Sequence, residues 1–210
     1  MYNILLFGGT GLLGNYFNKY GKKKIKIFNF LHKQSVNKNN ISVNISMNEI
    51  NNFVSEKKIE AIINFAADSN IENCEKNQKQ TYKTNVELPE YLSRVCRAKK
   101  IKFLHISTDH FFSNIHPIKE YCKVRAVNFY SKTKLEAEKK IILSNNKSII
   151  LRTNFFGKGL RKDSFSDKII KATVHKKKSY LFEDVFFNPV SMNTLSRVII
   201  FFIKKKYSGI

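Results

Sequence analysis

The sequence predicts an α/β protein with a Rossmann-type, doubly wound parallel sheet, helices on both faces and a small, incomplete C-terminal lobe. Short apolar runs alternate with amphipathic segments as far as Arg152, which is the pattern of repeated β–α units. Most of these runs are apolar throughout, so both faces of the strands are expected to be buried. A glycine-rich turn directly follows the first run, as it does in sheets that bind dinucleotides.

Each expected element follows from its own local pattern. Runs rich in Ile, Leu and Phe predict strands at residues 4–7, 24–30, 41–45, 61–65, 101–107 and 148–152. Apolar residues at helical spacing predict helices at residues 11–20, 47–57, 75–98, 129–143 and 191–206. The helix at 75–98 is expected to be interrupted or bent near Pro89, because proline has no N–H group and its ring crowds the preceding turn.

The turn after the first strand contains Gly8, Gly9, Gly11 and Gly14, which satisfy both G-x-G-x-x-G and G-x-x-G-x-x-G. Residues without Cβ allow a tight turn and let a pyrophosphate touch the backbone, while the helix N-terminus offers it free N–H groups. The alternative is a glycine-rich turn without a ligand. The sequence favours a dinucleotide site, and the residues expected to bind are Gly8, Thr10, Gly11, Leu12 and Leu13.

The end of the second strand bears on the choice of dinucleotide. Sites that prefer NAD usually place Asp or Glu there to bind the ribose 2′-hydroxyl. Residues 24–30 contain no acid, and His32 and Lys33 follow directly. A lysine attracts the 2′-phosphate of NADP, so we expect NADP(H) to bind better than NAD(H), with Lys33 as the main discriminator. The alternative is that Lys33 is an ordinary surface lysine.

Tyr130 and Lys134 stand four residues apart at the beginning of an expected helix, so their side chains share one face. An ammonium beside a phenol lowers the phenol pKa from about 10 and makes tyrosine a usable proton donor. The strand at 101–107 leads into Thr108, whose hydroxyl can hydrogen-bond a substrate carbonyl beside the tyrosine. The motif Tyr-x-x-x-Lys is common by chance, and such a pair often lies on a solvent-exposed helix face without any catalytic role. The hydroxyl of Thr108 nearby is the observation that favours a catalytic role here.

This order of motifs resembles the extended short-chain dehydrogenase/reductase superfamily, and within it the dTDP-4-dehydrorhamnose reductase family. The resemblance covers about residues 3 to 210. The segments that carry it are Ile63-Asn64-Phe65-Ala66-Ala67, Asn73-Cys74-Glu75, Tyr82-Lys83-Thr84-Asn85-Val86, His105-Ile106-Ser107-Thr108-Asp109-His110-Phe111-Phe112, Ile118-Lys119-Glu120, Asn128-Phe129-Tyr130, Leu151-Arg152-Thr153 and Asn188-Pro189-Val190.

The resemblance implies an NAD(P)H-dependent reductase that acts on a keto group of a nucleotide-linked sugar, in surface-polysaccharide synthesis. Tyr130 would donate the proton, Lys134 would assist it and hold the nicotinamide ribose, and Thr108 would orient the substrate carbonyl, with Ser107 as a less favoured substitute. The remaining implied contacts are those of Ala66 and Ala67 with the cofactor, and those of His110 and Asn154 with the substrate.

Three other residues have a structural interpretation as well as a functional one. The resemblance places Asn85 near the active site, and an ordinary amide on a helix surface is the alternative. His105 falls within a buried strand and is expected to be a hydrogen-bonded core histidine. Asp109 is expected to brace the following loop rather than to act as a base.

The chain departs from the family in three respects. Ser131 follows the tyrosine where the family usually has Gly, Val127 stands where proline is common, and family members continue beyond the length of this chain. We therefore expect an NAD(P)-binding domain at residues 1–155 and a partial substrate-binding lobe at residues 156–210, packed as one unit. The alternatives are an epimerase or dehydratase that recycles bound NAD, and a non-catalytic NAD(P)-binding regulatory subunit.

Composition and residue spacing argue against a nucleic-acid-binding, a membrane-spanning or a metal-binding protein. The formal charge is +22, but only 6 of the 38 basic residues are Arg and the lysines form scattered short clusters, so we expect no nucleic-acid partner. No apolar run is long enough to span a membrane. Three cysteines and five histidines show no metal-ligand spacing. We expect a cytoplasmic protein without a metal site, with a homodimer as the candidate assembly.

Overall fold

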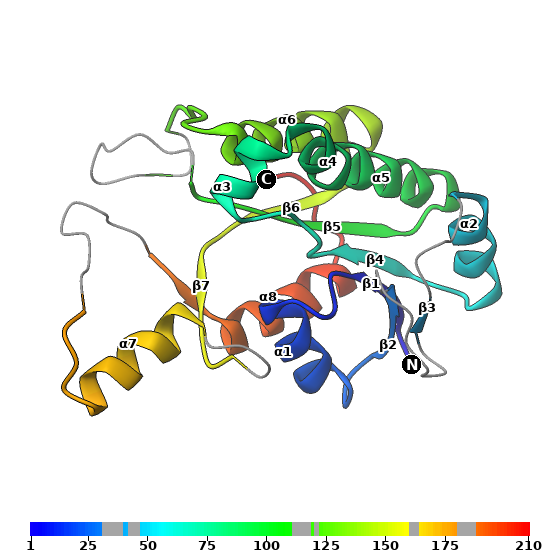
Figure 1. The fold of residues 1–210 in the computed structure, drawn as a ribbon. Coiled ribbons are helices and arrows are strands. Elements are labelled where there is room, and N and C mark those ends of the chain that lie inside the picture. Colours follow the sequence, from blue (N-terminus) through cyan, green and yellow to red (C-terminus); the bar gives the residue numbers. More distant parts are fainter. Residues whose placement is uncertain (31–39, 42–46, 111–118, 120–121, 160–163, 180–187) are drawn as a thin grey trace.

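The computed structural model describes residues 1–30, 40–41, 47–110, 119, 122–159, 164–179 and 188–210. Its main feature is a six-stranded sheet with the strand order β3-β2-β1-β4-β5-β6, in which all neighbouring strands are parallel. Helices cover both faces of this sheet (Figure 1). The expected doubly wound parallel sheet is therefore confirmed.

The strands are short, and the central ones are almost fully buried. Every residue of β4 is buried, as expected for a parallel strand with helices on both sides. The chain order reverses between β1 and β4, and sheets of this type bind ligands at such a reversal, beyond the carboxyl ends of the strands. The strand bounds are β1 Asn3–Phe7, β2 Lys26–Phe30, β3 Asn40–Ile41, β4 Ala61–Asn64, β5 Lys102–Ser107 and β6 Ile149–Arg152.

Two apolar layers hold the helices against the sheet. On one face, Phe17 of α1 and Ile199 of α8 are buried against Leu6 of β1. On the other face, buried residues of α2, α5 and α6 form a second apolar layer that includes Phe103 of β5. The bounds of these helices are α1 Leu12–Gly21, α2 Met47–Glu56, α5 Leu88–Lys99, α6 Phe129–Ser144 and α8 Met192–Lys204.

The single helix expected at residues 75–98 is instead a series of shorter helical pieces. α3 (Ile71–Lys76), α4 (Gln78–Tyr82) and a π-helical turn, η1 (Lys83–Glu87), precede α5. The break falls at Asn77, whose φ of −120° and ψ of 48° are not helical. Pro89 lies in the first turn of α5, where its missing N–H costs little. The π-helical turn η1 ends two residues before Pro89, so the helix is interrupted near Pro89 as expected, and the break at Asn77 is a second one that was not expected.

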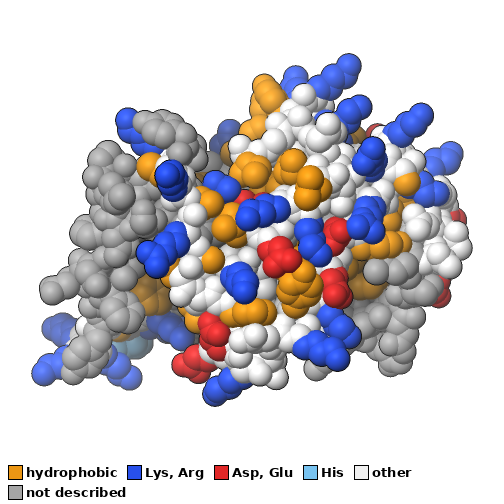
Figure 2. Space-filling model, turned by 90° about the horizontal axis from the view of Figure 1, so that it is seen from above, with side chains coloured by type: hydrophobic (Ala, Val, Ile, Leu, Met, Phe, Trp, Pro, Cys, Tyr) orange, Lys and Arg blue, Asp and Glu red, His pale blue; other side chains and the backbone are white. Residues whose placement is uncertain are grey.

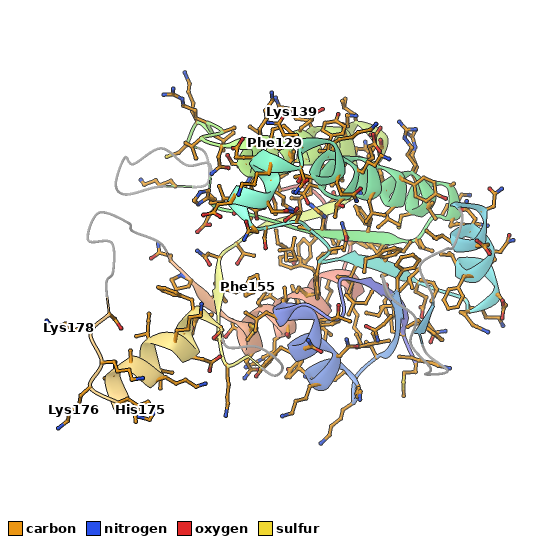
Figure 3. All side chains as sticks on the ribbon, viewed as in Figure 1. Phe129, Lys139, Phe155, His175, Lys176 and Lys178 are labelled. Atoms are coloured by element: carbon orange, nitrogen blue, oxygen red, sulfur yellow. The ribbon has the colours of Figure 1, made fainter. Side chains whose placement is uncertain are left out.

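The segment after β6 adds a short parallel pair, β7 (Phe155–Phe156) and β8 (Val190–Ser191), and the helix α7 (Phe165–Val174). α7 lies apart from the sheet and buries none of its residues (Figure 1). His175, Lys176 and Lys178 follow at its outer end (Figure 3). α8 packs in the same apolar layer as α1, and the division between residues 155 and 156 stays a prediction.

Charged side chains are dispersed on the face that Figure 2 shows. Lys and Arg alternate there with Asp, Glu and hydrophobic side chains rather than gathering in one basic stripe. Ion pairs join some of them: Glu90 of α5 pairs with Arg94 at 2.5 Å and with Lys140 of α6 at 3.2 Å. Within the described ranges, no helix has the length and apolar character needed to cross a membrane.

Candidate active site

A cavity of about 460 Å³ lies beyond the carboxyl ends of β1, β4 and β5. The glycine turn, the segments that follow β4 and β5, and the beginning of α6 all contribute to its wall. The predicted site residues that line it are Gly8, Gly11, Leu12, Leu13, Ala67, Thr108, His110, Tyr130, Lys134 and Asn154. The fold therefore brings the glycine turn and the Tyr–Lys pair to one cavity.

The glycines of the turn serve two different purposes. Gly8 has a φ of 77°, and a Cβ there would lie 2.5 Å from the backbone nitrogen of Ala66. A Cβ on Gly14 would lie 2.2 Å from the carbonyl oxygen of Gly8. A Cβ on Gly11 would meet only that same oxygen, at the ordinary contact distance of 3.4 Å. Packing thus requires glycine at positions 8 and 14, whereas packing within the protein does not require it at position 11.

The N-terminus of α1 is suited to an anion. Gly11 is the N-cap residue, no side chain caps the helix there, and the first turn contains no acidic residue. The first N–H groups of the helix and its positive dipole end are therefore not neutralised by the protein's own side chains. Together with the bare backbone of Gly11, this geometry fits a pyrophosphate.

Some predicted cofactor residues do not line the cavity. Thr10 is exposed, and its carbonyl oxygen accepts a hydrogen bond from Asn15 at 2.7 Å. Ala66 packs against the apolar layer below α5 and α6, and its N–H donates to Asn64. Neither Thr10 nor Ala66 is among the residues that line the cavity, and their contacts with a cofactor stay predictions. His32 and Lys33 lie outside the described residues.

The Tyr130 phenol lies beside the loop that follows β5. The Thr108 side chain hydrogen-bonds to it, and Thr108 Oγ1 also accepts the backbone N–H of His110 at 3.1 Å. The rings of His110 and Tyr130 have centroids 6.4 Å apart. Burial raises the pKa of Tyr130, and the hydrogen bond with Thr108 offsets part of that rise. The phenol therefore keeps its proton at neutral pH.

Lys134 points from α6 toward β5. Its Nζ donates to the carbonyl oxygen of Ile106 at 2.7 Å and lies 2.9 Å from His105 Nε2. The residue is only 2% exposed, and burial lowers the pKa of Lys134 to about 7. The expected lowering of the Tyr130 pKa by Lys134 is wrong for this arrangement, because the amino group is engaged by β5 and burial dominates the pKa of the phenol.

His105 contacts the site through Lys134, and this contact was not predicted from the sequence. It is a buried, hydrogen-bonded histidine as expected, but its partners are Asn64 and Lys134. Burial, aided by the charge of Lys134, holds the pKa of His105 well below its ordinary value, so the ring is neutral. Asn64 and His105 are register partners on β4 and β5. The sequence did contain a sign of this contact, because Asn64 and His105 are polar residues near the ends of two successive apolar strands.

Asn85 is a structural amide next to the cavity. It is completely buried, which contradicts the alternative of a helix-surface residue. Its Oδ1 accepts the backbone N–H of Asp68 at 2.8 Å, and its Nδ2 donates to the Asp68 carbonyl oxygen at 2.9 Å and to Thr133 Oγ1 at 3.1 Å. Asn85 therefore ties the segment after β4 to helix α6, which carries Tyr130.

Asp109 and Asn154 meet on another part of the wall. Burial raises the pKa of Asp109, and a hydrogen bond with the Asn154 side chain partly offsets the rise. This pairing fits a bracing role for Asp109. Phe155 on β7 lies close by in the chain and also lines the cavity (Figure 3). Further lining residues that the sequence reasoning did not assign are Phe65, Ser69, Ile71, Ile106 and Thr153.

No group of three side chains suited to a metal ion converges in the part of the chain that the structure describes.

Comparisons with known proteins point to one family. The chain matches the family model described as the RmlD substrate binding domain over residues 2–209. A dTDP-4-dehydrorhamnose reductase of Aggregatibacter actinomycetemcomitans is 28% identical over 161 residues, which are 74% of this chain and 52% of that protein. A probable low-salt glycan biosynthesis reductase of Haloferax volcanii is 29% identical over 102 residues, which are 48% of this chain and 34% of that protein. The chain thus spans about half the length, or less, of these curated relatives.

Solved structures share the fold over the whole chain. A dTDP-4-dehydrorhamnose reductase from Clostridium acetobutylicum has a TM-score of 0.82 at 27% identity, covering 99% of this chain and 72% of that one. A dTDP-4-dehydrorhamnose reductase from Bacillus anthracis, solved in complex with NADP, has a TM-score of 0.84 at 21% identity, covering 100% of this chain and 73% of that one.

Proposed function

The chain belongs to the RmlD substrate-binding domain family, and we propose that it is an NAD(P)H-dependent reductase of a nucleotide-linked keto-sugar. The observation that carries the proposal is the convergence of Thr108, Tyr130 and Lys134 on the cavity that the glycine turn also lines. A positioned proton donor and a dinucleotide cradle in one cavity meet the requirements for reducing a carbonyl group. The reductase relatives support the same reaction class.

The glycine turn supports a nicotinamide dinucleotide as the cofactor. The bare backbone of Gly11 and the uncapped N-terminus of α1 fit a pyrophosphate. Bound there, the cofactor would supply the hydride. The Bacillus anthracis relative was solved with NADP, and we extend that ligand class to this chain. The preference for NADP(H) over NAD(H) rests on Lys33 and His32 in the sequence.

Tyr130 is proposed as the donor of a proton to the substrate oxygen. Its raised pKa keeps the phenol protonated, which is the form that a reduction consumes. The Thr108 hydroxyl holds the phenol in place and can hydrogen-bond the same substrate oxygen. Lys134 presents an N–H group to the cavity, where a ribose hydroxyl of the cofactor is its proposed acceptor.

His110 and Asn154 are the proposed substrate contacts. Both line the cavity, His110 beside the Tyr130 ring and Asn154 beside Asp109. The sugar nucleotide carries a diphosphate, and the net charge of +22 attracts such an anion to the molecule.

The test is a paired measurement of binding and turnover on the 210-residue protein. Titration with NADPH should show binding, and addition of a dTDP-linked 4-keto-sugar should consume NADPH in equal amount to the reduced sugar formed. Conversion of a sugar nucleotide without net NADPH consumption would favour the epimerase or dehydratase alternative. Tight NADPH binding without any conversion would favour a regulatory role.

A further inference from the structure

The first turn of α6 determines where Tyr130 stands. Asn128 is the N-cap residue of this helix, Phe129 is its first helical residue and Tyr130 is its second. The first N–H groups of a helix have no partner within the helix, and helix ends fray when nothing accepts them. The groups that accept the N–H groups of this turn therefore bear on the position of the Tyr130 phenol.

Part of the turn is closed by residues of α6 itself. Asn128 Oδ1 accepts the backbone N–H of Ser131 at 2.8 Å. Ser131 Oγ in turn accepts the backbone N–H groups of Val127 at 2.9 Å and of Asn128 at 3.1 Å. Ser131 is completely buried, so these hydrogen bonds are shielded from water. This capping box does not involve the N–H of Phe129, which lies directly before Tyr130 in the chain.

The N–H of Phe129 is accepted by a side chain from a different helix. Glu75 Oε1, on α3, lies 2.8 Å from the Phe129 backbone nitrogen. α3 packs against α6, and Phe129 marks this end of α6 (Figures 1 and 3). A carboxylate at this place also faces the positive end of the helix dipole, which strengthens the hydrogen bond. Glu75 thus joins α3 to the first turn of α6.

Helix α3 also borders the cavity. Its first residue, Ile71, lines the cavity wall. Cys74 is completely buried and lies near enough to the Tyr130 phenol to raise its pKa. The Cys74 thiol donates to the carbonyl oxygen of Asp68 at 3.4 Å. α3 is therefore held against the segment after β4 on one side and, through Glu75, against α6 on the other.

The two ends of Tyr130 are held by different parts of the fold. The Thr108 side chain, after β5, hydrogen-bonds to the phenol. The backbone is held by the first turn of α6. A reacting group that is displaced by about 1 Å can lose about 10²-fold in rate. The phenol therefore stays in register with Thr108 only if the first turn of α6 keeps its place.

We propose that Glu75 is a positioning residue for Tyr130, and that it acts by holding the first turn of α6 from α3. The inference rests on the proposed reductase function, in which Tyr130 donates the proton. Glu75 is not among the residues that line the cavity, so it acts through the helix and not on the substrate. The alternative is that the hydrogen bond contributes only to the stability of the fold.

Substitutions of Glu75 separate these two roles. We expect Glu75→Ala to lower kcat by about tenfold and to leave both KM for the nucleotide sugar and the NADPH dissociation constant nearly unchanged. Glu75→Gln keeps a side-chain oxygen that can accept the Phe129 N–H, so we expect it to retain most of the turnover. An unchanged kcat in Glu75→Ala, even with a lowered urea midpoint, would identify a stabilising role alone and overturn the proposal.

Glu72→Ala is the matched control. Glu72 is an exposed carboxylate in the first turn of the same helix, and its loss changes the net charge equally. We expect kcat to stay at the wild-type value. A tenfold loss in Glu72→Ala as well would assign the effect to charge or to α3 in general, and would overturn the proposal for Glu75.

A double variant tests whether Glu75 acts through Tyr130. In a Tyr130→Phe background there is no phenol to position, so adding Glu75→Ala should lower single-turnover NADPH oxidation by less than about twofold. A further tenfold loss in the double variant would show that Glu75 acts on another part of the site, and would overturn the proposal.

The last test does not depend on activity. NMR of the ¹⁵N-labelled protein reports exchange of the Phe129 amide with solvent, and ¹³C-labelled tyrosine reports the Tyr130 ring, whose signal is the one that Tyr130→Phe removes. We expect Glu75→Ala to speed the Phe129 exchange by about tenfold and to shift the Tyr130 signal, and Glu75→Gln to change neither. An unchanged Tyr130 signal in Glu75→Ala would overturn the positioning role, whether or not the protein reduces a sugar nucleotide.

The inference and the proposed function fail in different ways. A wild-type protein that reduces no nucleotide-linked keto-sugar would contradict the proposed function, while the NMR signals would still report whether Glu75 positions Tyr130. An active wild type with an equally active Glu75→Ala variant would overturn the positioning role and leave the proposed function intact.

Discussion

A Cβ on Gly14 would lie 2.2 Å from the carbonyl oxygen of Gly8. Helix α1 is therefore seated directly on the turn that precedes it, backbone against backbone. Gly11, between the two, has ordinary room for a Cβ within the protein. Packing explains the glycine at position 14, and ligand binding is the remaining explanation for the glycine at position 11. Substitution of Gly14 should therefore change stability, whereas substitution of Gly11 should change dinucleotide binding.

We expect Gly14→Ala to lower the free energy of unfolding by about 1–3 kcal/mol, because rotating a side chain cannot relieve a clash with backbone atoms. Urea unfolding should show a lower midpoint at an unchanged slope. Gly21→Ala is the matched control, because its Cβ would meet only side-chain atoms: the end of Ile27 at 2.8 Å, which can move, and Ile25 at the ordinary contact distance of 3.5 Å. Equal midpoints for Gly14→Ala and the wild type would refute the packing argument.

We expect Gly11→Val to abolish dinucleotide binding while the sheet stays folded. The backbone at Gly11 is extended, with φ −70° and ψ 175°, so valine is tolerated there. Its branched side chain would occupy the space where a pyrophosphate approaches the helix N-terminus. Calorimetric titration with NADPH checks the loss of binding, and urea unfolding of the same sample checks that the sheet stays folded. Undiminished affinity would mean that the turn does not bind a dinucleotide.

We expect Tyr130→Phe to reduce turnover by about 10²–10⁴-fold and to leave NADPH affinity nearly unchanged. The substitution removes the proposed proton donor and keeps the ring that packs near His110. Single-turnover NADPH oxidation with a nucleotide-linked keto-sugar is the measurement. Full turnover by the phenylalanine variant would exclude Tyr130 as the acid.

We expect Thr108→Val to move the basic limb of the kcat/KM profile to higher pH. The hydrogen bond with Thr108 lowers the Tyr130 pKa, so its loss lets burial raise that pKa further. Activity in the reducing direction needs the protonated phenol and is lost as pH rises through its pKa, which gives the direction of the shift. Ser107→Ala is the comparison, because Ser107 is the neighbouring hydroxyl. A shift of the basic limb in Ser107→Ala but not in Thr108→Val would mean that Ser107, and not Thr108, is the hydroxyl that acts on Tyr130.

We expect the wild type to bind NADPH more tightly than NADH, and Lys33→Ala to reduce that ratio. The argument comes from the sequence, in which no acid ends the second strand and Lys33 follows it to attract a 2′-phosphate. The dissociation constants of both cofactors in both proteins provide the check. Lys22→Ala, at an exposed lysine just after α1, controls for a general change in charge. Equal wild-type affinities would defeat the prediction.

Local patterns in the sequence were sufficient for the six-stranded sheet and for much of the cavity, whereas β7, α7 and β8 were not predicted. Apolar runs and helical spacing predicted the elements of the sheet and its layers, because each pattern reflects burial of a strand or of one helix face. The spacing of Tyr130 and Lys134 and the glycines of the turn are likewise local. Asn77 was missed because a single non-helical residue between two good helical segments has no periodicity of its own.

The sequence by itself determined which residue types stand at the ends of the strands and at the beginning of α6. Only the tertiary structure decided what those residues do to one another. Asn64 and His105 become neighbours because β4 and β5 pair in register, and Lys134 reaches them because α6 packs over the same strands. The pKa of Lys134 depends on burial, which arises from segments far apart in the chain. Spacing along a helix places two side chains on one face, but the surface packed against that face sets their pKa values.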